Sequence, residues 1–162
     1  MPCQATCTYC LCADSLNATF IHSLYDYTHL PEDTFGQRLK KLRLLKGLSQ
    51  YELGNQIGMQ HSMIGSYERD EFFPTLDSIK KLGKVLNTNL LCNEGYSKFL
   101  LNSSTFKDRL FKWRLENNLT KRDAAKLLGI SERGYSCWEE GTIMSINTYN
   151  KVISKLLYYN IV

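Results

Sequence analysis

Cysteine thiols are the most reactive groups that this sequence gathers in one place. Cys3, Cys7, Cys10 and Cys12 crowd into the first part of the chain. Thiolates at such short spacings can ligate zinc or an iron–sulfur cluster. However, a single residue separates Cys10 from Cys12, which makes an unstrained four-cysteine zinc site awkward.

The spacing Cys3-x3-Cys7-x2-Cys10 formally matches the cluster motif of radical S-adenosylmethionine enzymes. Those enzymes need a β/α barrel, and nothing downstream predicts one. A disulfide framework would conflict with the cytosolic location inferred below. We therefore expect no metal here and interpret the leader as disordered or incidental. Zinc binding or redox sensing by the four cysteines is the alternative.

The rest of the chain offers no convergent catalytic set. His22, His29 and His61 stand in unrelated settings, and no Ser/His/Asp or His/carboxylate arrangement is recognisable. We expect no catalysis and no cofactor.

Charge divides the chain into an acidic leader and two basic modules. The net charge is +4, yet residues 1–33 hold four acidic side chains and no Lys or Arg. Residues 34–91 hold nine basic against five acidic side chains, and residues 104–162 hold ten against six. This pattern is compatible with polyanion binding, although a solvated basic face is an equally common cause.

No apolar run of about 18 residues predicts a membrane span, and the start lacks the basic residues of a secretory signal. We expect a cytoplasmic protein.

The two basic modules are internal repeats. Gly47-Leu48-Ser49-Gln50 aligns with Asn118-Leu119-Thr120-Lys121. The same separation in residue number also pairs Gly58 with Gly129. Beyond a loop, the separation between matched residues is shorter by one position. Other matched pairs are Leu39 with Leu110, Leu53 with Ala124, Ile57 with Leu128, and Tyr67 with Trp138.

Each repeat predicts a series of short helices. Phe35, Leu39, Leu42 and Leu45 follow helical spacing, and Gly47 ends that helix. Ser49 with Glu52 forms a capping box that opens a second helix, which stops at Gly58. A third helix follows, and Thr75 after Pro74 can cap a fourth. In the second repeat, Thr120 is expected to cap the start of the corresponding helix, and Gly129 is expected to end it. The prediction is an all-α fold with two tandem helix-turn-helix domains.

Both repeats contain a characteristic set of short motifs. In the first repeat they are Leu48-Ser49-Gln50, Glu52-Leu53, Ile57-Gly58, Ser62, Ile64, Glu68-Arg69, Pro74 and Leu76, and in the second Leu119-Thr120, Ala124-Ala125, Leu128-Gly129-Ile130-Ser131 and Trp138-Glu139-Glu140-Gly141. With these motifs the first repeat resembles the phage repressor/Cro (Xre-type) helix-turn-helix family. The resemblance covers about residues 34–91, and a weaker copy covers about 104–158. It implies a five-helix domain, four in a shortened copy, that binds operator DNA.

In the first repeat, the start of the third helix is the expected base reader. Gln60, His61 and Ser62 should face base edges in the major groove, with Ser66 one turn on. An exposed polar helix face is the alternative interpretation. Gln50, at a helix N-terminus, is a candidate phosphate ligand. Further phosphate candidates are Arg69, Lys40 and Lys46.

The resemblance also implies a partly buried ion pair between Arg43 and Glu68. Its recurrence as Arg114 and Glu139 favours a structural role in both copies. Removing one partner would strand a buried charge.

The second repeat is a weaker candidate for DNA binding. Ser131, Glu132, Arg133 and Cys137 take the base-reading positions, Lys121 replaces Gln50, and Gly134 falls inside the helix. Glu132 and Glu140 would face phosphates unfavourably, although Arg133 could read guanine. The alternative role is dimerisation or binding of a protein partner.

We predict a leader over 1–33, domains over 34–91 and 104–162, and a linker over 92–103. The predicted function is sequence-specific binding of double-stranded DNA by a transcriptional regulator, most simply a repressor, as a single chain or a homodimer. The alternative function is a protein-interaction module, such as an antitoxin, anti-repressor or inhibitor, that uses the second domain or the leader.

Overall fold

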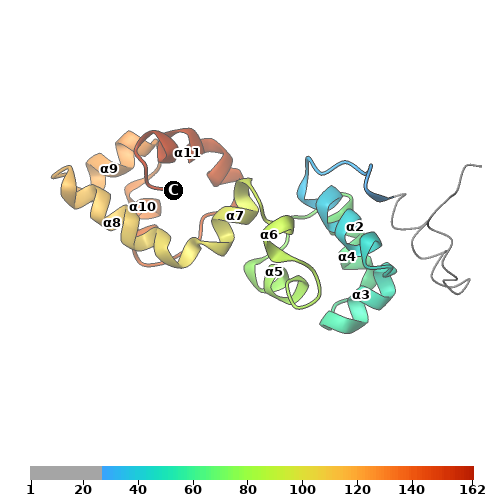
Figure 1. Cartoon of the computed structure of the whole chain (residues 1–162). Helices are drawn as coiled ribbons and strands as arrows, with labels where there is room; N and C mark the ends of the chain where they lie inside the picture. The colour runs from blue at the N-terminus through green and yellow to red at the C-terminus, as the bar shows by residue number, and fades with distance from the viewer. Residues whose placement is uncertain (1–26) are drawn as a thin grey trace, which may run out of the picture.

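The computed structural model describes residues 27–162, and this part of the chain is helical throughout, without β-strands. Helices α2–α4 gather at one end of the molecule and α8–α11 at the other, with α5–α7 between them (Figure 1). The elements are α2 (Phe35–Leu45), α3 (Gln50–Ile57), α4 (His61–Glu68), α5 (Leu76–Leu82), α6 (Thr88–Leu91), α7 (Gly95–Leu101), the 3₁₀ turn η1 (Ser103–Thr105), α8 (Phe106–Glu116), α9 (Lys121–Leu128), α10 (Glu132–Glu139) and α11 (Ile146–Tyr158). The all-α prediction is confirmed for the described residues.

Side-chain caps set where the first helices begin. The Ser49 hydroxyl accepts from the Glu52 N–H, while the Glu52 carboxylate accepts from the Ser49 N–H, as a capping box requires. The Thr75 hydroxyl accepts from the Ser78 N–H at the start of α5. A second capping box, which the sequence analysis did not anticipate, opens α2 at Thr34.

The helix bounds repeat with the sequence offset. The offset that pairs Gly58 with Gly129 also relates both ends of α2, α3 and α4 to those of α8, α9 and α10. Helix α11 begins one position earlier than the same offset from α5 would place it. Thr120 caps α9, as predicted from its alignment with Ser49. We call α2–α6 the first unit and α8–α11 the second unit.

Helix α7 joins the two units through aromatic contacts. The segment 92–103 was predicted as a linker, but most of it is helical, and Ser97, Phe99 and Leu100 are buried. The Tyr96 ring lies 5.1 Å from that of Phe73 in the first unit and 5.3 Å from that of Tyr149 in the second. Its hydroxyl donates to the Met144 carbonyl at 2.6 Å. The connection is therefore a packed element of the core.

The residues just before α2 are tied to the first unit. Lys41 Nζ donates to the carbonyls of Thr28 and Leu30 and pairs with the Glu32 carboxylate. Arg38 donates to the Glu32 carbonyl at 2.8 Å. The described end of the predicted leader thus packs against α2. Within residues 27–162, no helix combines the length and apolar character needed to cross a membrane.

Gly58 allows a direct test of the turn between α3 and α4. It ends α3 in the left-handed region, with φ of 64°, and an added Cβ would meet no atom within 4 Å. A side chain there is therefore opposed by backbone strain alone. We expect Gly58→Ala to destabilise the protein by about 1–2 kcal/mol, measured by urea unfolding.

Gly58→Asn is the matched variant, because Asn tolerates the left-handed region better than Ala. It should lower the free energy of unfolding clearly less than Gly58→Ala does. Equal costs for the two variants would contradict this account of the turn.

Candidate nucleic-acid interface

Helices α3 and α4 pack through their apolar faces. Leu53 and Ile57 of α3 and Ile64 of α4 are buried. The left-handed Gly58 reverses the chain, and the Met59 N–H donates to the Gly54 carbonyl at 2.8 Å. The result is the helix, glycine turn and helix that the sequence predicts.

The first turn of α4 points away from this core. Gln60, His61 and Ser62 are exposed, and Ser66, one turn on, is half-buried. Gln60 occupies the N-cap position without making a side-chain capping bond. Its amide makes no hydrogen bond within the described part of the chain. The structure thus brings the predicted base-reading residues to one exposed helix end.

Two further exposed side chains lie beside this set. The Tyr51 ring lies 6.1 Å from the His61 ring, and Tyr51 and Met63 are both exposed. A shallow cleft of about 410 Å³ lies between Tyr51 and Met59–His61. Sequence reasoning missed both residues, although each stands at a helical position outside the apolar stripe, which is the signal that could have found them.

A buried ion pair fixes α4 against α2. Arg43 Nε donates to Glu68 Oε1 at 2.6 Å and Arg43 Nη2 to Glu68 Oε2 at 3.0 Å. The side chains are only 7% and 4% exposed. Arg43 Nη1 also donates to the Leu48 carbonyl at 2.6 Å, so one guanidinium ties together α2, α4 and the turn before α3.

Gln50 joins this network instead of standing free for phosphate. Its Nε2 donates to Glu68 Oε2 at 2.8 Å, which leaves one amide hydrogen for another partner. Of the remaining phosphate candidates, Arg69 pairs with Glu71 at 2.6 Å on the surface. Lys40 and Lys46 are exposed and form no ion pair with described residues.

The second unit repeats the network with altered partners. Arg114 Nε donates to Glu139 Oε1 at 2.7 Å, and Lys121 Nζ lies 3.5 Å from Glu139 Oε2, where Gln50 stands in the first unit. Tyr135, which aligns with Ile64, is fully buried beside them. Burial raises the pKa of Tyr135, and the Glu139 carboxylate raises it further, so the phenol stays protonated.

The start of α10 differs from the start of α4. The Ser131 hydroxyl accepts from the Gly134 N–H at 3.1 Å, so it caps the helix, a bond that Gln60 does not make in α4. Glu132 and Arg133 are exposed, and Cys137 is half-buried. The second unit therefore presents one acidic and one basic side chain at this end.

The cysteine cluster Cys3, Cys7, Cys10 and Cys12 lies outside the described residues. Among residues 27–162, no group of three or more potential ligands is placed to hold a metal ion. Cys92 is buried, and burial raises the pKa of its thiol.

Comparison with known proteins finds a family match within the first unit. Residues 39–91 match the family described as helix-turn-helix. The chain is similar to the SPbeta prophage-derived uncharacterized HTH-type transcriptional regulator YonR of Bacillus subtilis (strain 168). The two are 34% identical over 67 residues, which make up 40% of this chain and 62% of that protein.

It is also similar to the HTH-type transcriptional regulator PuuR of Escherichia coli (strain K12) and of Shigella flexneri. Each is 36% identical over 55 residues, covering 34% of this chain and 30% of the relative. The matched part of the chain thus spans less than two thirds of the length of each of these relatives. No solved structure matches it significantly.

Removing one partner of the buried ion pair tests its structural role. We expect Glu68→Ala to lower the free energy of unfolding by about 3–5 kcal/mol, because Arg43 would keep a buried charge without its counter-ion. Urea denaturation followed by circular dichroism measures this loss.

Glu71→Ala is the control, since it removes an ion pair with Arg69 that is exposed on both sides. It should cost less than about 1 kcal/mol. If the two variants lost equal stability, burial would not be what makes the Arg43–Glu68 pair important.

Proposed function

We propose that the chain is a transcriptional regulator that binds double-stranded DNA sequence-specifically, with the start of α4 in the major groove. The main observation in support is that Gln60, His61 and Ser62 are exposed at the start of α4, while the end of this helix is fixed to α2 by the Arg43–Glu68 ion pair. The family match over residues 39–91 and the names of the relatives support this class.

Each proposed base contact has a chemical reason. The Gln60 amide carries a donor and an acceptor that have no partner among residues 27–162, which suits the two groove-facing atoms of adenine. His61 and Ser62 can donate to base acceptors, and Ser66 would act one turn further along. Met63 and Tyr51 would add apolar contact beside them, for which a thymine methyl is suitable.

Phosphate contacts would come from the surrounding residues. Lys40 and Lys46 are exposed and form no ion pair with the described residues, and the N-terminus of α3 offers backbone N–H groups. Arg69 would exchange Glu71 for a phosphate, which costs little because an exposed pair contributes less than about 1 kcal/mol.

The mode of regulation and the number of chains are further parts of the proposal. A regulator of this kind acts most simply as a repressor, by covering its operator. Two half-sites would be read by the tandem units of one chain or by the first units of two chains, about 34 Å apart. Hydrodynamic mass measured with and without operator DNA separates these arrangements.

Acidic side chains at the two ends of α10 favour a different role for the second unit. Glu132 is exposed at the start of the helix, next to Arg133, and Glu140 is exposed at its end. Carboxylates facing phosphates are unfavourable, so this unit would bind a protein partner or a second copy instead. A pull-down from nuclease-treated extract, compared with genomic DNA selection, tests which ligand the chain retains.

Selection of bound fragments from a random DNA pool tests sequence-specific binding. We expect enrichment of one motif, and the affinity for it should fall at least about tenfold between roughly 50 and 200 mM salt because counterions are released on binding. An unenriched pool, or an affinity insensitive to salt, would overturn the proposal.

Substitutions within the first unit test the site itself. Gln60→Ala should reduce discrimination at one base position by about 1–3 kcal/mol, whereas Lys40→Gln should weaken all sequences alike. Competition gel shifts with single-base operator variants measure both effects.

Gln56→Ala is the matched control, since Gln56 is exposed on α3 outside the proposed contacts. It should leave discrimination unchanged. Unaltered discrimination in Gln60→Ala would show that the base-reading residues lie elsewhere.

A further inference from the structure

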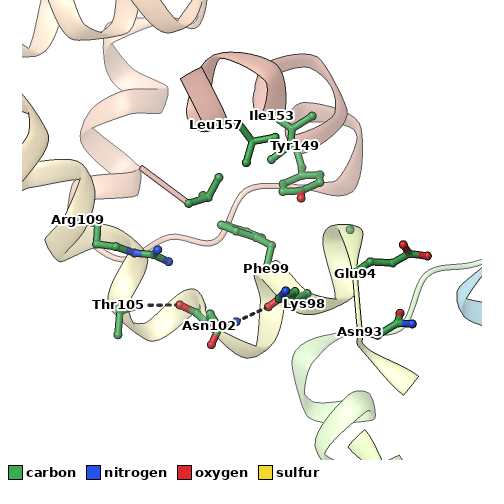
Figure 2. A pocket seen from close by; sticks show the side chains of 12 residues that line it. Asn93, Glu94, Lys98, Phe99, Asn102, Thr105, Arg109, Tyr149, Ile153 and Leu157 are labelled. Carbon is green, nitrogen blue, oxygen red and sulfur yellow. Dashed lines mark hydrogen bonds between the residues drawn. The ribbon is translucent and has the colours of Figure 1, made fainter. Parts of the chain in front are cut away.

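A second, larger pocket lies away from α3 and α4, between the connecting helix α7 and the second unit. It has a volume of about 880 Å³ and opens between α7, the start of α8 and α11 (Figure 2). We call it the junction pocket. Its size falls in the range of sites that hold small organic molecules.

One side of the junction pocket is an apolar wall. Tyr149, Ile153 and Leu157 descend from α11, and Phe99 faces them from α7 (Figure 2). The Phe99 and Tyr149 rings lie 5.2 Å apart, and both contact the Tyr96 ring. This wall is therefore held in shape by the core. Leu157 is 57% exposed, so apolar surface remains for a ligand to cover.

The opposite side carries positive charge without internal compensation. Lys98 of α7 and Arg109 of α8 line the pocket, and neither side chain forms a hydrogen bond or ion pair with the described residues. Glu94 is the acidic residue in the lining, and it is already paired with Arg38 at 2.9 Å. The side chains that line the pocket thus carry a net positive charge.

Neighbouring polar groups are partly occupied by the chain itself. Asn102 Nδ2 donates to the Lys98 carbonyl at 3.0 Å, and Thr105 Oγ1 donates to the Asn102 carbonyl at 3.0 Å (Figure 2). These bonds fix the end of α7. They leave the two cations as the charged donors available to a bound molecule.

We propose that the junction pocket binds an amphipathic monocarboxylate. Its apolar body would cover Phe99, Ile153 and Leu157, and its carboxylate would accept hydrogen bonds from Arg109 and Lys98. A planar guanidinium is suited to carboxylate recognition. The site uses neither α3 nor α4, so it does not rest on the proposed DNA contact.

Matched eight-carbon probes test this assignment. Titrating the ¹⁵N-labelled full chain with octanoate should shift amide signals of residues 95–105. Octan-1-ol should bind at least about fivefold more weakly, because it lacks the charge that Arg109 and Lys98 recognise, and octylammonium weaker still. Equal affinity for octanoate and octan-1-ol, or no octanoate binding, would overturn the proposal.

Variants then locate the carboxylate. Arg109→Gln should weaken octanoate binding about fivefold while leaving octan-1-ol unchanged. Lys151→Gln removes an exposed charge of α11 outside the pocket and should change neither. If Arg109→Gln and Lys98→Gln both bind octanoate like the unmodified chain, the assignment is wrong.

Leu157→Asn tests the apolar wall at a position exposed enough to tolerate the change, with circular dichroism as the check on folding. It should weaken octanoate and octan-1-ol together. If Leu157→Asn instead converts a dimer to a monomer and octanoate does not bind, a second copy covers this face and the proposal fails. Operator binding, measured separately, decides the proposed function independently of these results.

Discussion

The buried Glu68 carboxylate is the constraint on which the first unit depends. A charge that is almost fully withdrawn from water must be paired and hydrogen-bonded, or the folded state loses several kcal/mol. Arg43 donates hydrogen bonds to both carboxylate oxygens of Glu68, and Gln50 donates to one of them. Arg43 also donates to the Leu48 carbonyl. One carboxylate thereby fixes the relative positions of α2, α3 and α4.

This arrangement separates the buried end of α4 from its exposed first turn. Its last residue, Glu68, is locked in the network, and Ile64 and Tyr67 are buried. Its first turn lies beyond the network and remains exposed. Helix α2 approaches α4 so closely that a Cβ on Gly36 would lie 2.4 Å from the Tyr67 carbonyl oxygen. The first turn of α4 is therefore held on a rigid support, which the proposed reading of a duplex groove would require.

Aromatic packing gives the two units a common core. Rings follow one another from Phe35 through Phe73 to Tyr96, and from Phe99 through Phe106 to Trp138, at centroid distances of 5.1 to 6.1 Å. Tyr96 and Phe99 both lie on α7 and connect the two series. Helix α7 thus contacts aromatic side chains of both units, and the junction pocket lies against this same helix.

The sequence by itself determined what depends on local chemistry and on repetition. Ser49 and Thr120 cap helices because a short hydroxyl side chain can satisfy nearby N–H groups, and Gly58 and Gly129 end helices because they adopt positive φ without strain. The offset between the two repeats placed α8, α9 and α10 relative to α2, α3 and α4. Tertiary structure alone decided that Gln50 is engaged with Glu68, that residues 95–101 form a packed helix, and that Lys98 and Arg109 share a pocket with α11. These features depend on contacts between residues far apart in the chain, which local propensity does not encode.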